Sequence, residues 1–389
     1  MDTNSGIPVS RRNERPTELP ALTSLRGLAA LTVLLFHSSY VAANFAGGAP
    51  PGLWRRGYLA VDLFFFLSGF VLTHVYRGRL IEERSWQSIG KFLWARFCRI
   101  YPASLFATAV FVLAGTVGRL PLPAGVSFKE QLIAALFLMQ VPWLDHIVIN
   151  SPAWSISAEC YAYLLFPLIV PLIFRLSSRV AAAIGIALLI GIAIVHVLFT
   201  HAQTDWGWGA LLRALPEFAA GIFAYRAYRE GLFAALWEKD ATLIFIMAMV
   251  IGGCFVGASD GVIVVLLLPL LLAAVCNSGR MANILNAPPL RWLGEISYSV
   301  YIFQALPLML AAGISGTLVA HGLGGSWFTA LAALLALGSG VLVHRRVDLP
   351  VRAALRRLPD RMMALAAASR GRETRPTPLV PVSVLERDR

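Results

Sequence analysis

The stretch 25-LRGLAALTVLLFHSSY-40 is an apolar run with an arginine near its start and a histidine near its end. Such a run is typical of a membrane-spanning helix, where charged side chains are costly and usually face a cavity or a partner. Arg26 and His37 are eleven residues apart. On a helix they point within about 20° of one another and lie roughly 16 Å apart along the axis. A snorkelling side chain is an equally simple explanation of Arg26, whereas the depth of His37 favours a functional role.

The composition places the whole chain in a membrane. Its 389 residues are 58% hydrophobic and 14% charged, with a mean hydropathy of +0.70. A soluble domain has about 25% charged residues. The net charge of +12 does not indicate nucleic acid binding, because basic cytoplasmic loops give the same total. We expect membrane lipids as partners and no nucleic acid. The four cysteines show no metal-ligand spacing and no disulfide framework, so we expect no metal.

Eleven apolar blocks follow one another along the chain. They lie near residues 21–46, 58–76, 97–116, 130–143, 154–174, 180–199, 208–228, 241–258, 261–277, 292–315 and 326–344. The block at 130–143 is the shortest and has the length of a re-entrant or interfacial segment. Both termini are basic, so the positive-inside rule puts both in the cytoplasm and requires an even number of spans. We predict an all-α polytopic membrane bundle of about ten transmembrane helices plus this re-entrant or interfacial segment.

This scheme divides the chain into three parts. Residues 1–20 form a polar cytoplasmic N-terminus, 21–346 a membrane domain, and 347–389 a basic cytoplasmic tail that is partly disordered. The first apolar stretch is longer than the apolar region of a cleavable signal, so it stays as a span. One loop disagrees with the scheme, since the basic stretch 54–57 would lie outside. The location that fits is a bacterial cytoplasmic (inner) membrane.

The second and third spans also carry charged residues. Asp62 enters the membrane at a depth comparable to His37, where a carboxylate can fix the tautomer of an imidazole. Its alternative role is that of a helix-terminal residue facing the lipid headgroups. Arg96 and Arg99 are three residues apart and share one helix face. Their planar guanidinium groups suit phosphates, although the positive-inside rule is the stronger explanation from charge alone.

Other polar residues lie deep in later blocks. Glu159 lies about one helical turn inside the membrane, four residues after Ser155, and needs a partner or water there. Arg213 and Glu217 are also four residues apart, which predicts a helix-stabilising ion pair. His196 is the one other histidine deep in an apolar block, and its surroundings in the sequence are unremarkable. The stretch 293-LGEISYSVYIFQ-304 is by itself compatible with an interfacial aromatic belt.

The order of these features resembles the integral-membrane family called acyltransferase 3. The chain has R-x10-H in the first block, VDLFFFLSGF in the second, R-x-x-R-I-Y-P before the third, then WSISAE with YLLFP, and finally ISYSVYIFQ. The resemblance runs from about residue 19 to 350. Members move acyl groups, usually acetyl, onto sugar hydroxyls of cell-surface or secreted glycans. The resemblance therefore implies transfer from cytoplasmic acyl-CoA (acetyl-CoA) to a hydroxyl of an extracytoplasmic glycan or a glycolipid.

With the residues argued above, the resemblance implies three groups of site residues. The catalytic residues are His37, Asp62 and Glu159, the donor-binding residues are Arg26, Arg96 and Arg99, and the substrate-binding residues are Trp154, Ser155, Tyr298 and Gln304. In this scheme the catalytic histidine either takes the hydroxyl proton as general base or carries the acyl group itself. No metal takes part.

Three departures from the family pattern stand out. Gln304 occupies a position where the family often has histidine, and Asp348 with Pro350 stands where it often has E-x-P. Many members add a soluble hydrolase-like domain after the last span, and here none follows the last apolar block, so we expect the membrane part to act alone or with a partner.

Two other classes of function are alternatives to an acyltransferase. One is a transporter or flippase of a lipid-linked sugar, in which buried charges line a pathway; the lack of an internal repeat argues against it. The other is a scaffold of an envelope assembly complex, which no specific residue supports. The acceptor, the acyl chain length and the oligomeric state are left open.

Overall fold

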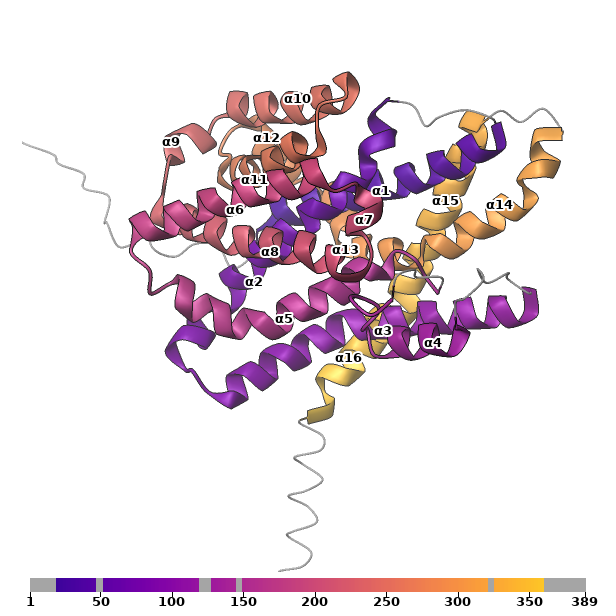
Figure 1. The fold of residues 1–389 in the computed structure, drawn as a ribbon, viewed down its shortest axis with the longest axis horizontal. Helices are drawn as coiled ribbons and strands as arrows, with labels where there is room; N and C mark the ends of the chain where they lie inside the picture. Colours follow the sequence, from indigo (N-terminus) through magenta and orange to yellow (C-terminus); the bar gives the residue numbers. More distant parts are fainter. Residues whose placement is uncertain (1–18, 47–51, 119–126, 145–148, 321–324, 360–389) are drawn as a thin grey trace, which may run out of the picture.

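A computed structural model describes residues 19–46, 52–118, 127–144, 149–320 and 325–359, and every regular element in these ranges is helical. The all-α prediction is therefore confirmed for the described residues (Figure 1). The elements are α1 (Pro20–Ala46), η2 (Gly52–Leu59), α2 (Ala60–Glu82), α3 (Trp86–Gly118), α4 (Phe128–Leu136), α5 (Ala153–Ile173), α6 (Ser178–Leu198), α7 (His201–Thr204), α8 (Gly207–Glu230), α9 (Ala234–Trp237), α10 (Asp240–Val256), α11 (Asp260–Cys276), α12 (Arg280–Leu285), α13 (Pro288–Phe303), α14 (Ala305–Ala320), α15 (Gly325–Val343), η3 (His344–Asp348) and α16 (Leu349–Arg356).

Fewer segments qualify as membrane spans by helix length and hydropathy than the sequence predicted. Six segments among the described residues are long and apolar enough to cross a membrane, or seven if the bent pair α13–α14 is one span. The helices α10 and α11 are apolar but only 17 residues each, and α8 carries five charged residues. The protein is thus a helical membrane protein, while the count of ten spans stays a prediction that depends on these helices.

Two predicted blocks differ in detail from a single span. The block at 130–143 contains α4, which has nine residues and is too short to cross a bilayer core about 30 Å thick. The block at 292–315 is not one helix, because α13 and α14 meet at Gln304 with a bend of 55°. Pro307 lies one turn further on and has no N–H to continue the hydrogen-bond ladder, which gives a physical reason for the break.

Two glycine pairs allow the central helices to touch backbone to backbone. A methyl group at Gly27 would lie 2.5 Å from the Gly294 nitrogen, and one at Gly294 would lie 1.9 Å from a backbone oxygen of α1. The same holds between α2 and α8, where a methyl group at Gly69 or Gly221 would lie 2.0 Å or 2.2 Å from a backbone oxygen of the facing helix. Only glycine permits such approach.

Both close helix pairs run parallel. Along α2 and α8, Asp62 contacts Arg213 near the start and His74 stacks edge-on against Tyr225 further along. Along α1 and α13, Gly27 lies against Gly294, and further along both helices His37 lies beside Gln304. Parallel spans must be separated by an odd number of intervening crossings. With α3, α5 and α6 crossing between α2 and α8, this parity requires that α4 does not cross.

The last helices continue without interruption past the predicted domain boundary. A π-helical turn, η3, joins α15 to α16, so the chain is helical from 325 to 356. Asp348 is fully buried at this turn. Residues 1–18 of the predicted N-terminal segment and residues 360–389 of the predicted tail lie outside the described residues.

Candidate active site

A cavity of about 440 Å³ lies between α1, α2, α3, α5 and α13. Six of the ten predicted site residues line it, and they come from four separate motifs: Arg26, Arg96, Arg99, Ser155, Glu159 and Tyr298. The other four, which are His37, Asp62, Trp154 and Gln304, do not line it. The chain therefore brings most of the predicted residues together in one place.

Arg26 is held inward by the close packing of α1 on α13. Its Nη2 and Nε atoms donate to the Gly294 carbonyl oxygen at 3.0 Å and 3.3 Å. The glycine contact between these helices makes that carbonyl reachable. The side chain lines the cavity, so the structure does not fit a snorkelling arginine.

Arg96 and Arg99 also face the cavity. Arg96 donates from Nη2 to the Tyr76 hydroxyl at 2.9 Å, and its guanidinium lies 5.2 Å from the centre of that ring. Arg99 lies 5.5 Å from the centre of the Tyr298 ring, and its Nη1 atom is 3.9 Å from Asp348 Oδ2. Loop charge alone does not require two arginines to point into a shared cavity, so this placement favours a ligand-binding role.

Asp348 is the buried carboxylate behind Arg99. Its Oδ2 atom lies 3.2 Å from His344 Nδ1 and 3.3 Å from the Ser299 hydroxyl, and it also accepts from Arg352. These contacts join α13, the π-helical turn η3 and α16. The residue that departs from the family's E-x-P pattern therefore still supplies a carboxylate close to the arginine pair.

Glu159 has the partners that its depth requires. It accepts a hydrogen bond from the Ser68 hydroxyl and faces the hydroxyl of Tyr163. The Ser68 hydroxyl is therefore bound to a carboxylate in the cavity wall. The carboxylate of Glu159 thus lines the same cavity as the predicted arginines.

The aromatic residues of α13 point inward. The Tyr298 hydroxyl donates to the Ile100 carbonyl, and the Tyr301 hydroxyl lies 2.7 Å from Ser155 Oγ. An interfacial aromatic belt does not describe these two residues. Trp154 does not line the cavity, because its ring lies 5.3 Å from the Arg213 guanidinium, which belongs to a different group of polar residues.

His37 lies outside the cavity and faces Gln304. The side chain of Gln304 and the Val33 carbonyl are polar neighbours of its imidazole. Its Nδ1 atom is buried and makes no hydrogen bond of normal geometry with any described residue, and the same is true of Gln304 Oε1. The Nε2 atom of Gln304 donates to the Tyr301 carbonyl at 3.1 Å. Two predicted site residues therefore meet at the bend between α13 and α14.

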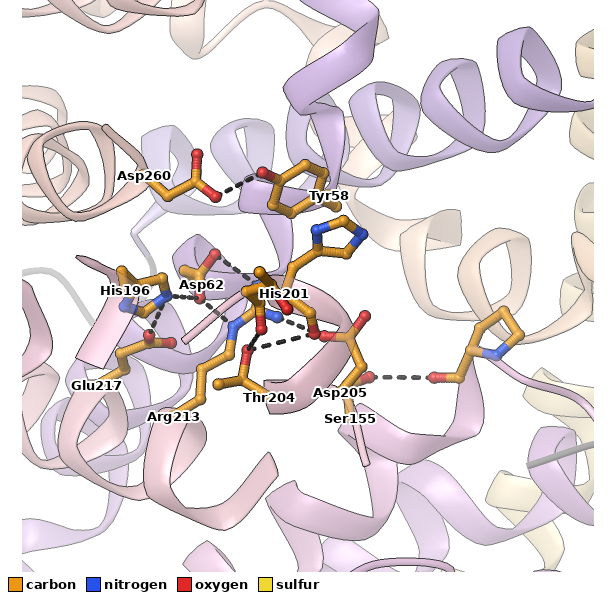
Figure 2. A network of polar contacts seen from close by, with 12 residues as sticks. Tyr58, Asp62, Ser155, His196, His201, Thr204, Asp205, Arg213, Glu217 and Asp260 are labelled. Atoms are coloured by element: carbon orange, nitrogen blue, oxygen red, sulfur yellow. Dashed lines mark hydrogen bonds and ion pairs between the residues drawn. The ribbon is translucent and has the colours of Figure 1, made fainter. Parts of the chain in front are cut away.

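Asp62 does not lie beside His37, contrary to the prediction. Its Oδ1 atom lies 2.6 Å from Arg213 Nε and 3.3 Å from His196 Nε2, and its Oδ2 atom lies 2.8 Å from Arg213 Nη2 (Figure 2). The reason is the glycine contact of α2 with α8, which turns Asp62 towards α8 and α6. A catalytic role for Asp62 next to His37 has no geometric support.

The predicted ion pair of Arg213 with Glu217 is also wrong. Arg213 binds Asp62 and, through Nη1 at 2.5 Å, Asp205. Glu217 lies instead 3.5 Å from His196. Burial raises the pKa of the Asp205 carboxyl, and the Arg213 guanidinium opposes that shift. His196 was the residue that the sequence missed, although an imidazole deep in an apolar block was itself a signal.

A helical membrane protein with an arginine-lined cavity is the class that the fold and site define. The family described as an acyltransferase domain, acyltransferase 3, matches residues 19–345. The chain belongs to this family, and it is a membrane acyltransferase.

Relatives agree with the family. Acyltransferase MdmB of Streptomyces mycarofaciens is 29% identical over 372 residues, which are 86% of this chain and 92% of that protein. The peptidoglycan O-acetyltransferase OatA of Listeria monocytogenes is 22% identical over 319 residues, which are 74% of this chain and 49% of OatA. The O-acetyltransferase OatA of Staphylococcus aureus is 26% identical over 74% of this chain and 50% of that protein. The chain thus spans about half the length of these OatA proteins. No solved structure matches it.

Proposed function

We propose that the protein moves an acyl group, specifically acetyl, from cytoplasmic acyl-CoA to a hydroxyl of an extracytoplasmic or lipid-linked glycan. The observation that carries this proposal is the convergence of Arg26, Arg96 and Arg99 on one cavity that also contains Glu159. The relatives support the chemistry, since two of them are named O-acetyltransferases and one of these acts on peptidoglycan.

The cavity suits part of an acyl-CoA molecule. Its volume of about 440 Å³ falls within the usual range of ligand pockets. Coenzyme A carries several phosphate groups, and arginine forks bind phosphates with charge-assisted hydrogen bonds. The positive-inside rule places this end of α1 and α3 at the cytoplasmic side, where acyl-CoA is made. Both termini would then lie in the cytoplasm.

His37 would act at the other end of the same helix. It lies about 16 Å further along α1 than Arg26, a gap that the extended pantetheine arm of the donor would cross. The imidazole accepts the proton of the sugar hydroxyl, the hydroxyl oxygen forms a bond to the acyl carbonyl carbon, and the carbon–sulfur bond breaks. The proton then passes to the thiolate of CoA. The alternative in which His37 carries the acyl group differs in having an acyl-imidazole intermediate.

Buried polar atoms that lack hydrogen-bond partners mark the proposed acceptor site. Buried polar atoms without a hydrogen bond are rare in folded proteins. His37 Nδ1 and Gln304 Oε1 are two such atoms among the described residues, and they lie at the bend between α13 and α14. A sugar with two neighbouring hydroxyl groups bound there would satisfy both of them, with one hydroxyl donating to His37 and the other to Gln304 Oε1. In this proposal Gln304 orients the acceptor, and the family's frequent histidine is not needed.

The test is transfer of label. Membranes from cells that overproduce the full chain are incubated with acetyl-CoA labelled in the acetyl group, and base-labile label is measured in the envelope glycan fraction. We expect label in the glycan, and its loss in membranes that carry His37→Ala. Translocation of a lipid-linked sugar without any incorporation of label would instead support a flippase and contradict the proposal.

A further inference from the structure

A second group of ionisable side chains lies outside the cavity, where α2, α6 and α8 meet. Asp62 comes from α2, His196 from α6 and Glu217 from α8, and their side chains point towards one another (Figure 2). The proposed acyl transfer uses none of the three. One ligand atom from each lies within 4.8 Å of the other two.

The distances between the side-chain atoms of this group match those between neighbouring ligand atoms around a metal ion. His196 Nε2 is 3.3 Å from Asp62 Oδ1 and 3.5 Å from Glu217 Oε1. Zinc bonds to nitrogen and oxygen are about 2.0–2.2 Å long, so two ligand atoms of a tetrahedral ion are about 3.4 Å apart. Both distances are longer than ordinary hydrogen bonds, and a single ion between the three atoms would account for them.

The imidazole of His196 is oriented as a metal ligand. Its Nδ1 atom is 3.0 Å from the Ile192 carbonyl oxygen. A carbonyl oxygen only accepts, so Nδ1 carries the proton and donates it. In the neutral ring this leaves the lone pair of Nε2 facing the two carboxylates. Metal-binding histidines are usually fixed by just such a bond from the other ring nitrogen.

Glu217 lacks a hydrogen-bond partner that would explain its burial. Its side chain is fully buried, and neither carboxylate oxygen makes a hydrogen bond with any described residue. A buried ionised carboxylate without a partner is strongly unfavourable. Its close polar neighbours are His196 Nε2 and the Asp62 carboxyl group, so the carboxylate points into the gap between the three side chains.

The charges nearby are out of balance. Three carboxylates, those of Asp62, Asp205 and Glu217, lie near the guanidinium of Arg213, and only the first two form ion pairs with it. That guanidinium is already used, because it binds both oxygens of Asp62 and one of Asp205. With a neutral imidazole the group has two negative charges in excess, and one divalent cation would neutralise them.

We propose that Asp62, His196 and Glu217 bind a divalent transition-metal ion. One imidazole nitrogen and two carboxylate oxygens are a donor set that suits zinc. Arg213 orients the Asp62 carboxylate, as hydrogen-bond donors commonly do for metal-bound carboxylates. The Asp205 side chain is 19% exposed and offers a route of entry. The ion would join three helices and stabilise the fold, independently of the acyl transfer.

The test is zinc binding by the full chain. The protein is purified in detergent, its affinity tag is cleaved, and metal is removed with a chelator before zinc is added and excess ion is dialysed away. We expect about one zinc per chain by elemental analysis, and a higher temperature of thermal unfolding with zinc than without, because a ligand of the folded state stabilises it. Glu217→Gln keeps the shape of the side chain and should weaken zinc binding by at least about tenfold.

Two further variants separate this site from other zinc binding. Asp260→Asn removes a carboxylate that binds Arg56 and Tyr58, outside the three ligands, and should bind zinc like the wild type. His196→Asn provides a second ligand variant should Glu217→Gln not fold. The proposal is wrong if the wild type retains no zinc and shows no thermal shift, or if both ligand variants bind zinc as the wild type does. Bound protons would then neutralise the excess charge.

Discussion

Arg26 and His37 share a face of α1 but contact different parts of α13. Arg26 binds the carbonyl of Gly294 and lines the cavity, whereas His37 faces Gln304 at the bend. The eleven-residue spacing therefore separates two tasks along one helix. One end holds charge where donor phosphates would bind, and the other holds a base where the acceptor would lie.

Loss of His37 should abolish transfer. A sugar hydroxyl is a poor nucleophile at neutral pH, and general base catalysis contributes about 10²–10⁴-fold. His37→Ala should therefore lower glycan acylation by about that factor while donor binding is kept. His201→Ala is the matched control, because this imidazole stacks on Tyr58 and does not line the cavity. Transfer by His37→Ala above about a tenth of the wild-type rate would rule out the assigned role.

Donor affinity should depend on the shape of the Arg99 side chain as well as its charge. Arg99→Ala should weaken acyl-CoA binding, and Arg99→Lys should restore it only in part because the planar fork is lost. Arg346 is exposed near the same end of the protein, so Arg346→Ala removes an equal charge without touching the cavity. Equilibrium binding of acetyl-CoA to the purified variants measures the effect. Equal affinities for Arg99→Ala and Arg346→Ala would mean that Arg99 only sets topology.

Glu159 should support the reaction through its charge. Glu159→Gln keeps the shape and an acceptor for the Ser68 hydroxyl but removes the negative charge from the cavity. We expect reduced transfer by a protein with an unchanged unfolding temperature. Full activity of the folded variant would assign Glu159 a structural role.

Local spacing predicted the cavity residues better than it predicted their partners. The three-residue spacing correctly placed Arg96 and Arg99 on one face, because helical periodicity is a local property. It could not show that Asp62 meets Arg213 and His196, since that depends on which helix packs beside α2. The four-residue spacing of Arg213 and Glu217 was misleading for the same reason. Buried partners from other helices replaced the expected local pair.

At the scale of helices, close packing depends on glycines. The sequence shows where these glycines are but not which helix each one contacts. Gly69 stands in the second apolar block, while its contact with α8 emerges only in the folded chain. The bend between α13 and α14 was hidden inside one apolar block, because hydropathy does not distinguish a straight span from a broken one. This bend is what brings Gln304 to His37.

Gly69→Ala should destabilise the protein by separating α2 from α8. The added methyl group would lie 2.0 Å from a backbone oxygen of α8, and overpacking of this kind costs about 1–3 kcal/mol. Gly252→Ala is the control, since a methyl group there meets nothing within 4 Å and should change stability little. Thermal unfolding in detergent compares the two. Similar unfolding temperatures would mean that α2 and α8 are not in backbone contact.

At the scale of the whole molecule, helix direction decides between the possible topologies. The pairs α1–α13 and α2–α8 are both parallel, as shown by contacts whose residue numbers rise together along both helices. A crossing by α4 would make α8 run opposite to α2. Loop charge and helix direction are independent observations, and they agree that the segment containing α4 stays on one side.

Labelling of single cysteines in whole cells tests this topology. Glu130 in α4 and Lys239 before α10 are both exposed side chains, so each can be replaced by cysteine after the four native cysteines are changed to alanine. A membrane-impermeant thiol reagent should label Glu130→Cys from outside the cytoplasmic membrane. It should label Lys239→Cys only after the membrane is opened, because that loop is predicted to be cytoplasmic. Transfer activity of each variant provides the folding control. Protection of Glu130→Cys together with labelling of Lys239→Cys in intact cells would invert the scheme and place the arginine-lined cavity on the side that lacks acyl-CoA.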